Sequence, residues 1–171
     1  MNADKSIITE RLSLGPIHES DQDALISIFK HEVVSATYMV PDIRSSEDEK
    51  KIFTALLTLS NRSDRYVYGI FLCDRLIGII NDTEINGRKI ELGYALNPDC
   101  FSRGYMTEAL NAMIKHLFTV GFDEVICGAF DHNLASIRVM QKCGMSMIEK
   151  TDEIKYGSAV HQCIYYSIKR S

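Results

Sequence analysis

Long apolar runs, paired cysteines and an excess of positive charge are all absent from this sequence of 171 residues. No apolar stretch approaches the roughly 20 residues that a helix needs to cross a bilayer. The first residues, MNADKSIITER, contain no apolar segment of the kind found in signal peptides. Only 3 prolines and 10 glycines are present, and no linker or repeat divides the chain. We therefore expect one cytoplasmic domain, spanning residues 1–171, that does not enter a membrane.

The cysteines occur singly, without a C-x-x-C motif, and their number is odd. Such a set is typical of reduced thiols, which are mostly buried as small apolar side chains. The five histidines show no zinc-ligand spacing, either among themselves or with the cysteines. The sequence therefore predicts free thiols and no metal site. The cysteines are Cys73, Cys100, Cys127, Cys143 and Cys163.

The formal net charge of −4 gives no general electrostatic reason to bind nucleic acid or an anionic membrane. The charge is uneven along the chain, however. Residues 1–100 contain 11 Lys and Arg against 16 Asp and Glu, whereas residues 101–171 contain 8 against 7. An anionic ligand is therefore more easily accommodated by the second part of the chain.

The hydrophobic pattern predicts a mixed α+β fold, with about six or seven strands in a mostly antiparallel sheet and about four helices. Capping boxes at Ser20-x-x-Asp23 and Ser46-x-x-Glu49 indicate two early helices, and residues 31–44 between them look irregular. The strongest helical stripe begins at Met106, and a short helix is expected over 134–143. Strands are expected over 7–14, 66–73, 76–85, 89–96, 124–130, 145–153 and 160–168.

The stretch YALNPDCFSRGYMTEALNAM, residues 94–113, runs from a predicted strand through a short loop into the long helix. A helix N-terminus carries unpartnered N–H groups and a partial positive charge, so it suits an anion. Gly104 permits a close approach of the backbone, and Arg103 adds a guanidinium suited to phosphate oxygens. The same residues also fit a tight turn followed by a solvated arginine. From spacing alone, both interpretations remain open.

The segments IELGYALNPDCFSRGYMTEAL and DHNLASIRVMQKCGM together resemble the GNAT superfamily of N-acetyltransferases, in its RimJ/RimL-like branch. The likeness extends over nearly the whole chain. TERLSLGPIHESDQDAL is similar to the first strand and helix of that branch, and HQCIYYSIKR to its last strand. The resemblance implies a GNAT-like sheet that splays between strands 89–96 and 124–130, with acetyl-CoA as co-substrate and no metal.

In the family, the pyrophosphate loop reads Gln/Arg-x-x-Gly-x-Gly/Ala, which falls here on residues 101–106. Two positions depart from that pattern, because Phe101 replaces Gln or Arg and Met106 replaces a small residue. By resemblance, Leu96 bonds the pantetheine arm and Asn133 bonds the pantetheine end of the cofactor. From the sequence alone, Asn133 fits nearly as well as the cap of the helix over 134–143. The cofactor-binding residues that we predict are Leu96, Phe101, Ser102, Arg103, Gly104, Tyr105, Met106, Thr107, Asn133, Ser136, Arg138 and Lys142.

The catalytic residues are less clearly marked. Many GNAT enzymes carry a tyrosine acid at the position of Met140, which cannot donate a proton. The branch instead implies Ser136 as the acid, although a capping or surface hydroxyl would look the same. Glu91 matches an acidic residue of the branch and is the predicted base, with Glu84 and Glu153 as rivals. Deprotonation through water would need none of the three.

The sequence thus predicts direct transfer of an acetyl group from acetyl-CoA to a primary amine, either a protein N-terminus or a small molecule. Neither nucleic acid nor membrane is an expected partner, and a homodimer is possible. Met106 and Met140 leave one alternative open, a catalytically silent acyl-CoA-binding module of the same fold.

Overall fold

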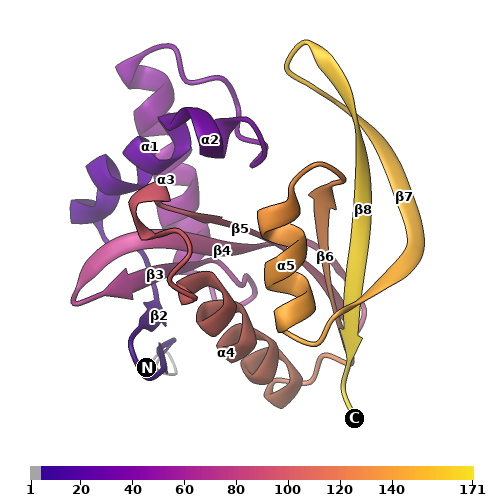
Figure 1. Ribbon diagram of the computed structural model, residues 1–171. Helices are drawn as coiled ribbons and strands as arrows, with labels where there is room; N and C mark the ends of the chain where they lie inside the picture. The colour runs from indigo at the N-terminus through magenta and orange to yellow at the C-terminus, as the bar shows by residue number, and fades with distance from the viewer. Residues whose placement is uncertain (1–4) are drawn as a thin grey trace.

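The computed structural model describes residues 5–171, which form an eight-stranded sheet with helices packed on it (Figure 1). The strand order is β1-β2-β3-β4-β5-β6-β8-β7. All neighbouring strands are antiparallel except β5 and β6, which are parallel and are joined through helix α4. The strands are β1 (Ile7–Ile8), β2 (Ser13–Gly15), β3 (Tyr68–Leu72), β4 (Arg75–Asn86), β5 (Lys89–Leu96), β6 (Glu124–Phe130), β7 (Ser146–Tyr156) and β8 (Ala159–Lys169).

Five α-helices accompany this sheet in residues 5–171, and the predicted mixed α+β class is confirmed. None of these helices is both long and apolar enough to cross a membrane. Two short 3-10 turns, η1 (Glu19–Asp21) and η2 (Pro98–Cys100), precede α1 and the loop before α4. The helices are α1 (Gln22–Lys30), α2 (Glu32–Ser35), α3 (Ser46–Ser60), α4 (Tyr105–Thr119) and α5 (Leu134–Lys142).

Helix α4 buries the apolar stripe that its sequence predicts. Ala109, Leu110, Met113 and Leu117 have no exposed surface and pack against one face of the sheet. Helix α5 lies beside α4 in Figure 1 and adds Met140 to the same cluster, with an exposed fraction of 0%. Burial of four such side chains supplies several kcal/mol, at roughly 1.5–3 kcal/mol for each large one.

The opposite face of the sheet is covered in part by α1 and α3. Their buried side chains, including Leu25, Phe29 and Phe53, pack against β3 and β4. Over β6, β7 and β8, the residues described on this face form a small separate cluster, in which Phe130 and Tyr165 are buried. The sheet is therefore covered on one side along α4 and α5, and less completely on the other.

The structure differs from the predicted elements at the first strand, within residues 31–44 and at the caps of α1 and α3, where Asp21 rather than Ser20 precedes α1. The expected first strand is a hairpin of β1 and β2, because the Thr9 N–H donates to the Leu12 carbonyl and turns the chain back. The supposedly irregular stretch 31–44 contains the one-turn helix α2. Its cap is His31, whose Nδ1 accepts from the Val33 N–H, and a histidine cap gives little sequence signal. The sheet accordingly has eight strands and five helices surround it.

Helix α3 also begins at a different cap from the predicted one. Ser45 rather than Ser46 forms the capping box, in which Asp48 and Ser45 exchange two side chain–backbone hydrogen bonds of 3.0 and 3.1 Å. Consecutive serines followed by several acidic residues offer two registers for the same motif. The pattern identifies the helix but leaves its first residue ambiguous.

Strands β5 and β6 separate along their length, as predicted. Their four residue pairs run from Lys89 with Glu124 to Leu92 with Cys127, and no pair follows in either strand. The Asn97 N–H donates to the Ile77 carbonyl on β4. Backbone groups of successive strand residues point to opposite sides, so Leu96 directs its N–H and C=O toward the gap beside β6.

Candidate active site

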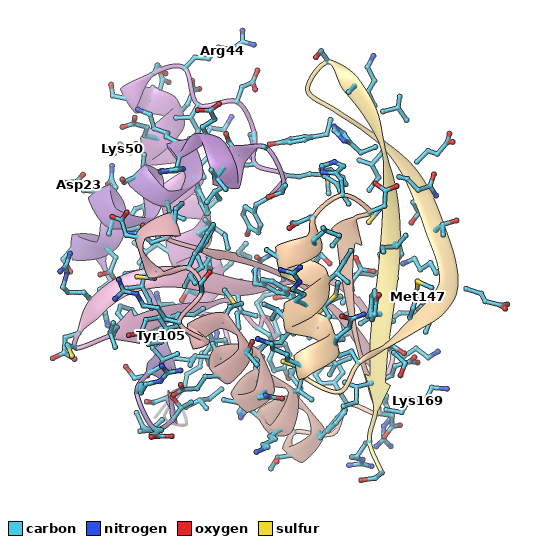
Figure 2. All side chains as sticks on the ribbon, in the orientation of Figure 1. Asp23, Arg44, Lys50, Tyr105, Met147 and Lys169 are labelled. Carbon is cyan, nitrogen blue, oxygen red and sulfur yellow. The ribbon has the colours of Figure 1, made fainter. Side chains whose placement is uncertain are left out.

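The loop between η2 and α4 holds its backbone in an unusual conformation. Gly104 has φ of 78° and Ser102 has φ of 60°, and Tyr105 (Figure 2) then begins the helix. Glycine adopts positive φ without the steric cost that a Cβ adds. A Cβ at Gly104 would also lie 3.4 Å from Nη2 of Arg11. The geometry of the helix entry thus favours the predicted glycine.

The same loop presents a row of free backbone donors. The Glu108 N–H makes the first helical bond, to the Gly104 carbonyl at 3.0 Å. Within residues 5–171, no N–H group from Ser102 to Thr107 donates a hydrogen bond. These donors stand at the positive end of the α4 dipole, which carries roughly half an elementary charge. The loop therefore has the free donors that an anion site needs, and its role as such a site stays a prediction.

Arg11 braces this loop from the start of the chain. Its Nη1 donates to the Arg103 carbonyl at 2.9 Å, and its Nε donates to Glu108 Oε2 at 2.7 Å. The guanidinium also lies 4.6 Å from the ring centroid of Tyr105. Thr9 adds a bond to the same carboxylate, from Oγ1 to Oε1 at 2.6 Å. No local pattern in the sequence announces these contacts, which span more than 90 positions.

A cleft of about 430 Å³ begins at this loop and extends past the end of β5 to α2. It brings together every predicted cofactor-binding residue except Arg103, whose backbone carbonyl faces Arg11 instead. The cleft is lined by Val33, Val34, Thr37, Tyr38, Tyr94, Ala95, Leu96, Cys100, Phe101, Ser102, Gly104, Tyr105, Met106, Thr107, Asn133, Ala135, Ser136, Arg138, Val139 and Lys142.

The charge of this lining has one sign. Arg138 and Lys142 are exposed side chains four positions apart on α5, so they lie on the same helix face. No Asp or Glu belongs to the described lining. Together with the free N–H groups, the two cations make the loop end of the cleft favourable for phosphate groups.

Ser136 lies in the first turn of α5, where Asn133 caps the helix. The Asn133 Oδ1 accepts from the Ser136 N–H at 3.2 Å, so the capping role of Asn133 is confirmed while its side chain also lines the cleft. Ser136 Oγ donates to the Tyr94 hydroxyl at 2.8 Å. Sequence reasoning missed Tyr94, although its place in the predicted strand 89–96, two residues before Leu96, could have suggested a position near the gap.

Glu91 lies outside this cleft. In β5 it alternates with Tyr94, so its side chain is on the other face of the sheet. Its carboxylate accepts from Lys150 Nζ at 3.0 Å and from Thr83 Oγ1 at 3.2 Å. The structure therefore does not join Ser136 and Glu91 in one lining, and the role of Glu91 as a base stays a prediction.

A family model described as an acetyltransferase (GNAT) domain matches residues 11–146. This range contains the braced loop, the gap between β5 and β6, and α5. The protein belongs to the GNAT acetyltransferase family. The resemblance found in the sequence is thereby confirmed at the level of the family.

Individual GNAT relatives agree with this result. The chain is 26% identical over 141 residues to the uncharacterized N-acetyltransferase YoaA of Bacillus subtilis (strain 168), with 80% of both proteins covered. A GNAT-family acetyltransferase structure from Bacillus anthracis has a TM-score of 0.83 and 25% identity, covering 96% and 98% of the two chains. RimL, a ribosomal L7/L12 alpha-N-protein acetyltransferase solved with coenzyme A, has a TM-score of 0.84 and 20% identity, covering 96% and 97%.

Proposed function

We propose that this GNAT protein is an acetyl-CoA-dependent N-acetyltransferase that transfers an acetyl group directly to a primary amine. The observation that carries the proposal is the row of free N–H groups from Ser102 to Thr107, which stands at one end of the cleft. A pyrophosphate offers acceptor oxygens in a comparable row. Its two phosphates would be held by backbone donors, whatever the side chains at Phe101 and Met106.

The residues present fit acetyl-CoA along the cleft. Gly104 leaves the anion site open, and Arg138 and Lys142 can contact further phosphate oxygens. The backbone groups of Leu96 face the gap where β5 and β6 are unpaired, so an extended amide chain could bond there in the manner of an added strand. The departure at Met106 leaves this path open, since only 6% of this residue is exposed and it packs in the core between α4 and the sheet.

Bound acetyl-CoA would supply an activated carbonyl carbon and a thiol leaving group. The Leu96 N–H can donate to the carbonyl oxygen as negative charge develops there. Ser136 can donate to the departing sulfur from the opposite side of the gap. The amine must lose one proton, either to water or to Glu91 from the other face of the sheet, and the sulfur must gain one, so that an amide and a thiol are formed and the transfer is balanced.

We further propose that the acceptor is the N-terminal amine of a protein or peptide. The cleft continues beyond the loop between Val33, Val34 and Tyr38, and these side chains carry no charge. A polyamine would bring several cations to a lining without acidic residues, which is unfavourable. RimL, with the same fold, is a ribosomal-protein acetyltransferase, and this adds some support.

A silent acyl-CoA-binding module is the second candidate, because Met140 occupies the position of the usual tyrosine acid and is fully buried. Release of CoA thiol from acetyl-CoA, measured with peptides, amino acids, polyamines and aminoglycosides, separates the two functions. We expect CoA release with a peptide N-terminus and a mass increase of one acetyl group. Tight acetyl-CoA binding without release from any amine would reject the enzyme and support the silent module.

Gly104→Glu tests the anion site itself. The new carboxylate would repel phosphate, and a side chain at positive φ would strain the loop, so we expect the acetyl-CoA dissociation constant to rise roughly 100-fold or more. Calorimetry measures this constant. Gly87→Glu is the matched control, because Gly87 also has positive φ, at 58°, but lies in the β4–β5 turn with nothing near its Cβ. Equal affinities in the two folded variants would remove the loop from the proposal.

A further inference from the structure

Tyr94 and Ser136 form a closed pair of hydroxyl groups beside the gap in the sheet. Ser136 Oγ donates to the Tyr94 hydroxyl at 2.8 Å, and the Tyr94 hydroxyl donates to the Ser136 backbone carbonyl at 3.1 Å. The two residues are 42 positions apart, on β5 and α5. Both line the cleft, where β5 no longer pairs with β6.

This arrangement has a consequence for the only hydroxyl proton of Ser136. A serine hydroxyl has one hydrogen to donate and two lone pairs that accept. In this pair, that hydrogen is donated to Tyr94. Ser136 therefore donates to a bound sulfur only when its O–H has turned away from Tyr94, and a hydrogen bond from Tyr94 to Oγ would hold it in that orientation.

The change from one orientation to the other is a rotation of two O–H bonds and requires no movement of heavy atoms. If the Tyr94 O–H turns from the Ser136 carbonyl to Ser136 Oγ, the Ser136 O–H is free to turn toward the gap. Oγ then accepts one hydrogen bond from Tyr94 and donates another, and chains of this kind strengthen each bond. Burial raises the pKa of the Tyr94 phenol, so this side chain keeps its proton throughout.

We propose that Tyr94 is a positioning residue that orients the hydroxyl of Ser136 toward the sulfur of coenzyme A. The inference rests on the proposed function, because it extends the role of Ser136 at the same site. Tyr94 itself loses no proton. When the C–S bond breaks, the electron pair stays on sulfur, where the Ser136 O–H stabilises it until the proton released by the amine neutralises it.

The alternative is a purely structural role for Tyr94, in which its buried hydroxyl only donates a hydrogen bond to the Ser136 carbonyl of α5. That reading accounts for one of the two hydrogen bonds. It predicts that loss of the hydroxyl changes stability but neither turnover nor the interaction with sulfur. Kinetics and thiol-dependent binding therefore distinguish the alternatives.

The kinetic test compares Tyr94→Phe, Ser136→Ala and the double variant with the wild-type protein. Loss of one hydrogen bond to the reacting group should lower kcat roughly fivefold to tenfold in either single variant, with KM for acetyl-CoA unchanged. The double variant should be no slower than Ser136→Ala, because Tyr94 acts through Ser136. Tyr68→Phe is the control, since Tyr68 is a buried strand tyrosine whose hydroxyl meets His116 outside the cleft. A wild-type kcat in Tyr94→Phe, or losses that multiply in the double variant, would overturn the proposal.

A binding test decides the same point without turnover. The affinities of coenzyme A and of dethio-coenzyme A, which lacks the sulfur, are compared at pH 7 and at about pH 9.5, above the ordinary thiol pKa. The wild-type protein should favour coenzyme A severalfold more at the higher pH, because Ser136 donates to the thiolate. Tyr94→Phe should lose this preference and Tyr68→Phe should keep it. An undiminished preference in Tyr94→Phe rejects the inference, whereas a wild-type protein that releases no CoA from any amine rejects only the enzymatic function.

Discussion

At the level of single residues, the five cysteines differ in their exposure to solvent. All five thiols are free, as predicted, and Cys127, Cys143 and Cys163 are buried. Burial raises the pKa of Cys143 to about 11 and also raises the pKa of the other two. Because the thiolate is the reactive form, these three should react slowly. Cys73 is exposed in a turn and Cys100 is partly exposed in the cleft.

Cys100 consequently reports on the position of the co-substrate. We expect acetyl-CoA to protect Cys100 from iodoacetamide, slowing its alkylation roughly tenfold at saturation, because ligand and reagent compete for the same cleft. Cys73 provides an internal control and should react at the same rate with or without acetyl-CoA. Peptide mass spectrometry over a time course measures both rates. Alkylation of Cys100 that saturating acetyl-CoA leaves unchanged would place the co-substrate elsewhere.

At the scale of elements, the loop between η2 and α4 is held by the β1–β2 hairpin as well as by α4. Glu108, in the first turn of α4, accepts from Thr9 and from Arg11. Burial alone would raise the pKa of Glu108, but these hydrogen bonds outweigh it and hold the pKa below its ordinary value. Arg11 in turn holds the Arg103 carbonyl, so the carboxylate fixes the loop through one intermediate residue.

Glu108→Gln should therefore weaken acetyl-CoA binding, although Glu108 does not line the cleft. We expect the dissociation constant to rise roughly threefold to tenfold as the loop loosens, and the unfolding free energy to fall by about 1 kcal/mol, since Arg11 is 41% exposed. Asp123→Asn is the control, because Asp123 pairs with Arg88 and Arg170 beyond the other end of α4. Calorimetric titration and urea unfolding measure the two quantities. Equal acetyl-CoA affinity in the two variants would show that the contacts of Glu108 and Arg11 do not hold the loop in its binding conformation.

The sequence signals that succeeded were local. The stripe beginning at Met106 predicted α4, and Gly104 marked the helix entry, because periodicity and positive φ are properties of neighbouring residues. Helix α2 escaped notice because a single turn is too short to show a period. The contacts of Arg11 with Glu108 and of Tyr94 with Ser136 join distant segments. The hydrophobic pattern predicts which face of an element is buried, but it does not predict which distant polar side chain will form a hydrogen bond with a residue of that element.

Across the whole molecule, the resemblance to a family supplied what local pattern could not. Strands β5 and β6 separate after Leu92, and this separation depends on how the two strands are linked through α4. It cannot be predicted from the residues of either strand alone. The same limit applies to Glu91. Its place in β5 was predicted correctly, but its pairing with Lys150 depends on the β7–β8 hairpin packing at the far edge of the sheet. Only the assembled sheet determines on which side of the cleft such a carboxylate lies.

The stability of the whole fold should depend on pH through His116. This side chain lies on α4, with its Nε2 3.3 Å from the Tyr68 hydroxyl and Lys5 nearby. Burial, followed by the positive charge of Lys5, lowers the pKa of His116 below its ordinary value of 6.5. The unfolded chain therefore binds more protons than the folded one between these two pKa values. In that window the free energy of unfolding rises with pH. The contribution of His116 to stability is therefore lost progressively as pH falls from 6.5 to the lower pKa of the folded state.

His116→Gln removes this titration while keeping a polar group near Tyr68. Between pH 7 and pH 5, the melting temperature of the wild-type protein should fall further than that of His116→Gln, because the carboxylates that also titrate are common to both. His18→Gln, at an exposed position, should follow the wild-type curve. Differential scanning calorimetry at half-unit pH steps measures the difference. Parallel curves for the wild-type protein and His116→Gln would show that His116 binds its proton equally well in the folded and unfolded chains, and that its contact with Tyr68 accommodates the charged ring.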